Sequence, residues 1–93
     1  MTDDLAKRVQ LAAEALTSAG AREVFLFGSA ATGSLREESD VDLAVAGLPP
    51  ERFFEAMGKA GDVLGCPLDL VDLDEDTPFT RYLKEEGELI RVG

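Results

Sequence analysis

Apolar residues in the first half of the chain change from a helical to a strand period. Between residues 4 and 19 they recur every three or four positions, which predicts an amphipathic helix ending at Gly20. The apolar run at residues 24–27 predicts a short buried strand, and residues 41–46 predict a second one. The residues between these strands are small and polar, which predicts a helical turn followed by a loop.

The second half of the chain continues the alternation. Two prolines precede a helix whose apolar face carries Phe53, Met57, Ala60 and Leu64. Residues 68–73 predict a third strand, Thr77-Pro78 begins a helix that runs to about Glu86, and residues 89–92 predict a weak last strand. Because no crossover helix separates the first two strands, we expect an α/β fold with a mixed sheet flanked by helices.

Length and composition indicate one small globular domain over residues 1–93, with 45% hydrophobic residues. No apolar run approaches the roughly 20 residues that span a bilayer, so no membrane association is expected. The acidic N-terminus is unlike a secretory leader, and Cys66 is the only cysteine. These features favour a soluble, cytoplasmic protein.

The charge balance narrows the chemistry further. The chain has no histidine, so catalysis by histidine and histidine-ligated zinc are excluded. With 19 acidic and 9 basic residues the net charge is −10, which disfavours DNA or RNA as a primary ligand. A basic protein surface is a more natural partner.

Two aspartates enter the second predicted strand in the pattern Asp40-Val41-Asp42. Side chains alternate along a strand, so the two carboxylates share a face and repel each other unless a cation lies between them. Mg²⁺, held by one or two carboxylates and substrate phosphates, is the simplest such cation. The alternative is a solvated strand entrance without function.

The third predicted strand carries another aspartate within an apolar run. Asp69 shares a face with Val71 and Leu73, whereas Asp72 lies on the opposite face near the strand end, where exposure explains it. If this strand neighbours the second one, Asp69 joins Asp40 and Asp42. The pattern alone leaves this arrangement open.

A candidate phosphate-binding turn precedes the aspartates. The first apolar strand ends at Gly28-Ser29, where glycine allows close backbone approach and N–H groups with a hydroxyl can hold a phosphate. The signal is weak alone, and the Gly-Lys-Ser/Thr element of a P-loop is missing.

The combination is more specific than its parts. Gly28-Ser29, ten intervening residues and Asp40-Val41-Asp42 resemble the signature of nucleotidyltransferases with a DNA-polymerase-β-like fold. The short chain and residues 68–73 narrow the resemblance to the minimal nucleotidyltransferases (MNT), which are often antitoxins of HEPN toxins. It implies that Gly28 and Ser29 hold the triphosphate of ATP, and that Asp40, Asp42 and Asp69 bind two Mg²⁺ ions. Asp69 would also deprotonate or orient the acceptor hydroxyl.

The resemblance also implies a biological role. An MNT protein of a type VII toxin–antitoxin pair transfers AMP from ATP to a tyrosine of its HEPN toxin and inactivates it. A contact-only antitoxin and a small-molecule nucleotidyltransferase are the alternatives. The chain lacks room for the second domain of larger relatives, so a partner or self-association completes the site. Ala30 and Thr32 stand where relatives frequently carry arginine, which puts extra cationic contacts to the phosphates in doubt. Tyr82 is expected to pack in the core, and the alternatives are that it stacks on a base or accepts AMP.

Overall fold

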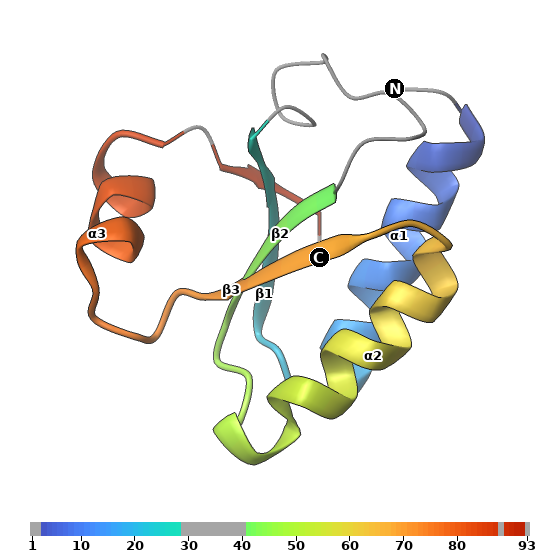
Figure 1. Ribbon diagram of the computed structural model, residues 1–93, viewed down its shortest axis with the longest axis horizontal. Coiled ribbons are helices and arrows are strands. Elements are labelled where there is room, and N and C mark those ends of the chain that lie inside the picture. The colour runs from blue at the N-terminus through green and yellow to red at the C-terminus, as the bar shows by residue number, and fades with distance from the viewer. Residues whose placement is uncertain (1–2, 29–40, 88, 93) are drawn as a thin grey trace.

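The computed structural model describes residues 3–28, 41–87 and 89–92, and within them the elements follow the predicted order (Figure 1). Ser29, Ala30, Thr32 and Asp40 lie outside the described residues, as do the predicted turn and loop. In chain order the elements are α1 (Asp3–Ser18), β1 (Glu23–Phe27), β2 (Val41–Ala46), the 3₁₀ turn η2 (Pro50–Arg52), α2 (Phe53–Leu64), β3 (Leu68–Asp72), α3 (Pro78–Glu85) and β4 (Ile90–Arg91).

The described strands form a four-stranded mixed sheet in the order β3-β2-β1-β4. β1 runs antiparallel to both β2 and β4. β2 and β3 are parallel and are connected through α2. The predicted mixed sheet is therefore confirmed, and β3 is one of its two outer strands.

Helices α1 and α2 cover one face of this sheet and build the larger core (Figure 1). The strands contribute large aliphatic side chains to this core, including Val24, Leu26, Val41, Leu43 and Val45. The helices meet through small residues, and Ala56 rather than the predicted Met57 is fully buried in α2. Alanine permits closer approach of two helices than methionine does, which explains the difference.

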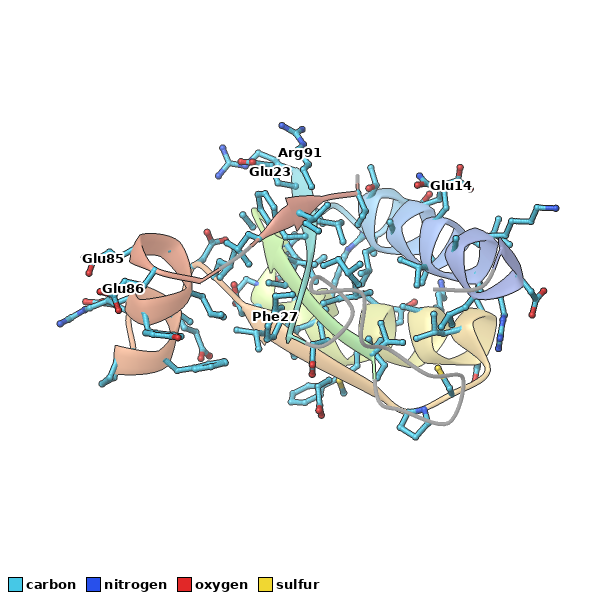
Figure 2. All side chains as sticks on the ribbon, turned by 90° about the horizontal axis from the view of Figure 1, so that it is seen from above. Glu14, Glu23, Phe27, Glu85, Glu86 and Arg91 are labelled. Carbon is cyan, nitrogen blue, oxygen red and sulfur yellow. The ribbon has the colours of Figure 1, made fainter. Side chains whose placement is uncertain are left out.

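The opposite face carries a smaller core under α3. Phe27, Ala44, Leu73 and Leu83 are its buried members. Figures 1 and 2 place α3 on the side of the strands away from α1 and α2. Among the described residues, no helix is long and apolar enough to cross a membrane.

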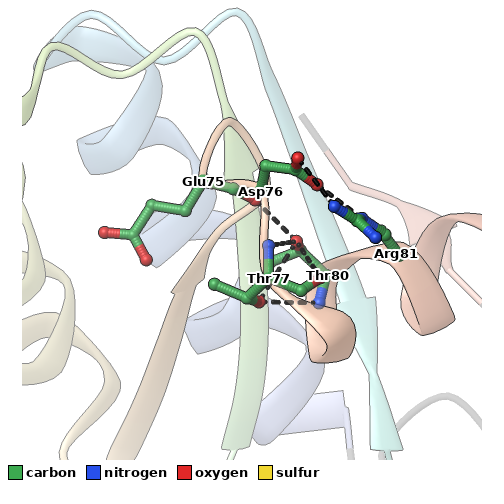
Figure 3. A network of polar contacts seen from close by, with 5 residues as sticks. All are labelled: Glu75, Asp76, Thr77, Thr80 and Arg81. Atoms are coloured by element: carbon green, nitrogen blue, oxygen red, sulfur yellow. Dashed lines mark hydrogen bonds and ion pairs between the residues drawn. The ribbon is translucent and has the colours of Figure 1, made fainter.

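Helix α3 begins at a well-formed cap. Thr77 is its N-cap, as predicted: Thr80 N–H donates to Thr77 Oγ1 at 3.1 Å, and Thr77 N–H donates to Thr80 Oγ1 at 3.0 Å (Figure 3). The buried Thr80 hydroxyl also donates to the Glu75 carbonyl oxygen. Arg81 forms a two-point contact with Asp76, with distances of 2.6 and 2.9 Å. These contacts fix the start of α3 relative to the end of β3.

Candidate active site

Asp42 and Asp69 lie directly opposite each other on the parallel strands β2 and β3. Hydrogen-bonded strands are roughly 4.8 Å apart, so the two residues are close neighbours. The residues flanking Asp42, Val41 and Leu43, are buried under α1 and α2, so Asp42 faces the other side of the sheet. Val71 packs in the smaller core on that side, which places Asp69 on the same face as Asp42.

The two aspartates differ in their environment. Asp42 is half-buried, whereas Asp69 is exposed on the outer strand. A half-buried carboxylate is positioned by its surroundings, and an exposed one is accessible to a second molecule. The pair therefore offers one fixed oxygen ligand and one that an incoming group can reach.

Gly28, the residue after β1, borders the site on the side of Asp42 away from β3. Phe27 is the strand partner of Asp42, and Gly28 follows it with φ at +69°, in the left-handed region that favours glycine. A Cβ atom added to Gly28 would lie 2.3 Å from Asp42 Oδ2, far inside contact distance. The Asp42 carboxylate thus occupies the space that any larger residue would need at position 28.

Asp72 does not belong to this pair. It is half-buried, and its Oδ1 accepts a hydrogen bond from Asp74 N–H at 2.9 Å in the turn after β3. This local contact explains an aspartate at the end of a strand, although the predicted exposure is only partial. The backbone alternation places it on the face opposite Asp69.

The donor set fits a hard divalent cation. Two carboxylates on one sheet face supply oxygen ligands of the type that Mg²⁺ takes together with substrate phosphates. Within residues 3–28, 41–87 and 89–92, no group of three potential metal ligands is present. The predicted third and fourth groups, Asp40 and Ser29, fall outside this part of the chain, and their roles stay predictions.

A groove beside the site was not anticipated from the sequence. It has a volume of about 510 Å³ and lies between the start of α2, the second half of β3 and the start of α3. Two of its aromatic residues are exposed, Phe54 to 77% and Phe79 to 50%. Phe79 also contacts Phe27 edge-to-face, with ring centroids 6.2 Å apart. The groove is formed by segments that the tertiary fold brings together, so the sequence alone does not reveal it.

Tyr82 corrects one expectation. It is 54% exposed on α3 and therefore does not pack in the core. The buried face of the short helix is occupied by Thr80 and Leu83, which leaves the adjacent position outward. Cys66, in contrast, is partly buried and packs against the larger core.

The fold and the paired carboxylates define a small nucleotidyltransferase-like domain. The family model "Polymerase beta, Nucleotidyltransferase" matches residues 10–91, and the chain belongs to this family. A comparison with curated proteins gave no significant match.

Solved structures show the same fold. The structure of a putative minimal nucleotidyltransferase is 27% identical, covers 92% of both chains and has a TM-score of 0.74. The crystal structure of a toxin–antitoxin with AMP-PNP is 25% identical over 88% of this chain and 70% of that chain, with a TM-score of 0.67. The toxin–antitoxin MntA-HepT, at 19% identity, covers 95% of this chain and 71% of that chain with a TM-score of 0.65, and supports the fold alone.

Proposed function

We propose that this chain is a Mg²⁺-dependent nucleotidyltransferase that uses ATP and acts as the antitoxin of a type VII toxin–antitoxin pair. Its acceptor would be a tyrosine of a HEPN toxin, which AMP attachment inactivates. The observation that carries the proposal is the direct pairing of Asp42 with Asp69 on one sheet face, with Gly28 against the Asp42 carboxylate. Family membership and the similarity to a toxin–antitoxin with AMP-PNP support it.

The residues divide the work according to their environment. Asp42 and Asp69, together with Asp40, would hold two Mg²⁺ ions, which neutralise phosphate charge and acidify an acceptor hydroxyl when bound. The half-buried Asp42 fixes the nucleotide end of the site. Gly28, whose backbone packs against the Asp42 carboxylate, and Ser29 would hold the triphosphate oxygens, Ser29 through its hydroxyl.

Asp69 is the residue that meets the acceptor. Its exposure on the outer strand lets it receive the proton of an incoming hydroxyl. The hydroxyl oxygen then forms a bond to the α-phosphorus of ATP, and the bond from that phosphorus to the bridging oxygen breaks. AMP stays on the acceptor and pyrophosphate leaves. Positioning and charge neutralisation account for most of the acceleration.

The test is Asp42→Asn. We expect this variant to lose transfer of label from α-labelled ATP to a co-purified HEPN toxin, because one metal-binding carboxylate becomes a neutral amide. Circular dichroism should show the wild-type fold. The matched control is Asp62→Asn, which changes an exposed aspartate of α2 outside the site and should leave transfer unchanged.

Two results would contradict the proposal. Label transfer by Asp42→Asn at the wild-type rate would remove this aspartate from the site. A wild-type protein that neutralises the toxin without adding the mass of AMP to it would instead establish the contact-only antitoxin.

A further inference from the structure

The outer strand β3 has an open hydrogen-bonding edge. Val41 N–H donates to the Pro67 carbonyl oxygen at 3.0 Å, and Leu73 N–H donates to the Val45 carbonyl oxygen at 2.8 Å. In a parallel pair, alternate residues direct their backbone groups to the same neighbour. The backbone groups of 67, 69, 71 and 73 therefore face β2, and those of 68, 70 and 72 point away from it. The Asp72 carbonyl oxygen accepts a hydrogen bond from Glu75 N–H at 3.2 Å, so the edge available for pairing runs along residues 68 and 70. Among the described residues, no strand pairs with this edge.

The groove described above follows this edge. Leu70 and Asp72 line it from the strand, Phe53 and Phe54 from the start of α2, and Phe79 from the start of α3. Figure 1 shows α2 and α3 on either side of β3. An extended peptide laid along β3 would find backbone partners on the strand and apolar contacts on both sides, as in recognition by strand addition.

The acidic charge of the groove favours a peptide with basic side chains. Its two ionisable lining residues, Asp72 and Glu75, are both acidic, and the whole chain carries a net charge of −10. Pairing of two copies through β3 would bring the aspartates of both strands together, which like-charge repulsion disfavours. A segment bearing lysine or arginine has the complementary charge.

The groove also adjoins the candidate active site. Asp69 lies two residues before the groove-lining Val71 on the same face of β3, roughly 6.6 Å away along the strand. A segment that pairs with this strand would pass the carboxylate proposed to meet the acceptor. The open edge of β3 therefore leads directly to Asp69, the residue proposed to meet the acceptor hydroxyl.

We propose that the outer edge of β3 and this groove dock an extended, basic segment of the acceptor protein and guide its hydroxyl to Asp69. The inference rests on the proposed nucleotidyl transfer for the role of Asp69, but docking itself needs no nucleotide. Binding and transfer can therefore be measured separately.

The docking experiment uses a synthetic peptide of about ten residues, which exceeds the length of an average strand. Lysine alternates with valine in it, and one tyrosine lies at the centre. Residue-resolved amide hydrogen exchange of the full chain is followed without nucleotide. We expect the Leu70 amide to exchange rapidly in the free protein and at least about tenfold more slowly with saturating peptide, because it gains a backbone partner.

Two altered peptides report on the mode of binding. A peptide with glutamate in place of lysine should not slow Leu70 exchange. A peptide with alternate N-methylated amides, which cannot complete a strand ladder, should bind at least about tenfold more weakly. Equal binding of all three peptides would overturn docking by strand addition.

Two variants report on the groove. Phe54→Ala and Glu75→Lys change exposed side chains and should each weaken peptide binding several-fold without loss of fold. Their matched controls are Tyr82→Ala and Glu14→Lys, which alter an exposed aromatic and an exposed acid outside the groove and should have no effect. Equal weakening by the controls would contradict the groove as the docking site.

The remaining outcomes separate the two proposals. Label transfer to the peptide without slowed Leu70 exchange would refute docking at β3 and leave nucleotidyl transfer standing. Slowed exchange at Leu70 without transfer to any acceptor would support docking and count against the proposed function. Slowing at high protein concentration without peptide would identify a second copy as the occupant and overturn the inference.

Discussion

The two faces of the sheet are built for different tasks. The face under α1 and α2 is filled with large aliphatic side chains, among them Val41, Leu43 and Val45, none of which is exposed. The opposite face alternates with it residue by residue and carries Asp42 and the small Ala44, beside an exposed Asp69. Adjacent residues of one strand therefore serve stability on one side and the candidate chemistry on the other.

The largest effect on stability is expected from Leu43→Ala. This side chain is fully buried, so its truncation removes apolar contacts and leaves a cavity, which costs about 2–5 kcal/mol of unfolding free energy. Urea denaturation of the variant and of Asp42→Asn, its neighbour on the other face, tests the comparison. If Leu43→Ala leaves too little folded protein, Val45→Ala provides a smaller truncation in the same core.

The assignment of the two faces predicts different consequences for these neighbours. Leu43→Ala should retain label transfer at temperatures where it is folded, whereas Asp42→Asn should retain stability and lose transfer. A clear loss of stability in Asp42→Asn would instead give this aspartate a structural role and break the contrast between the faces.

A smaller effect is expected from Gly28→Ala. The left-handed backbone and the 2.3 Å approach to Asp42 Oδ2 both oppose a methyl group, and we expect a loss of about 1–3 kcal/mol. The second cause disappears when the carboxylate is removed. In an Asp42→Ala background the cost of Gly28→Ala should therefore fall, leaving mainly the backbone contribution.

A double-mutant cycle, measured by chemical denaturation, isolates this contact. Non-additivity of about 0.5–3 kcal/mol is the range expected for residues in direct contact. Strict additivity would mean that the strand end relaxes away from the Asp42 carboxylate and that backbone conformation alone selects glycine.

Much of this architecture follows from local patterns in the sequence. Hydrophobic period and helix-capping residues predicted the element order, and strand alternation predicted that Asp69 faces the same way as Val71. The pairing of Asp69 with Asp42 required strand order and register, which no local pattern contains. The close approach of Gly28 to Asp42 depends on a different register, that of β1 and β2, in which Phe27 pairs with Asp42.

The misplaced Tyr82 lies on the short helix α3. It was expected in the core, yet its burial depends on which face of α3 meets the sheet. A helix of eight residues, such as α3, has too few positions for its period to decide this. Here Thr80, a polar residue, is buried because its hydroxyl completes the cap and reaches the Glu75 carbonyl.

The smallest effect on stability is expected at the start of α3, where this helix is attached to the sheet face that carries Asp42. The side-chain contact with Arg81, assisted by the charge of Lys84, holds the pKa of Asp76 below its ordinary value of 3.8. A carboxyl whose pKa is lowered by folding adds stability above its unfolded pKa and loses that contribution as the pH falls through the folded pKa. Both partners are exposed, so the contribution is small and screened by salt.

Asp76→Asn should therefore lower the unfolding free energy slightly at neutral pH and low salt, and the difference from the wild type should vanish in acid below the folded pKa. Parallel urea titrations across this pH range measure it, with Asp62→Asn as the control for a lost surface charge. A difference that persists in acid would show that Asp76 acts through the turn before α3 rather than through its ion pair. In that case the attachment of α3 would depend on the backbone geometry of the turn, whereas the attachment of α1 and α2 depends on aliphatic packing.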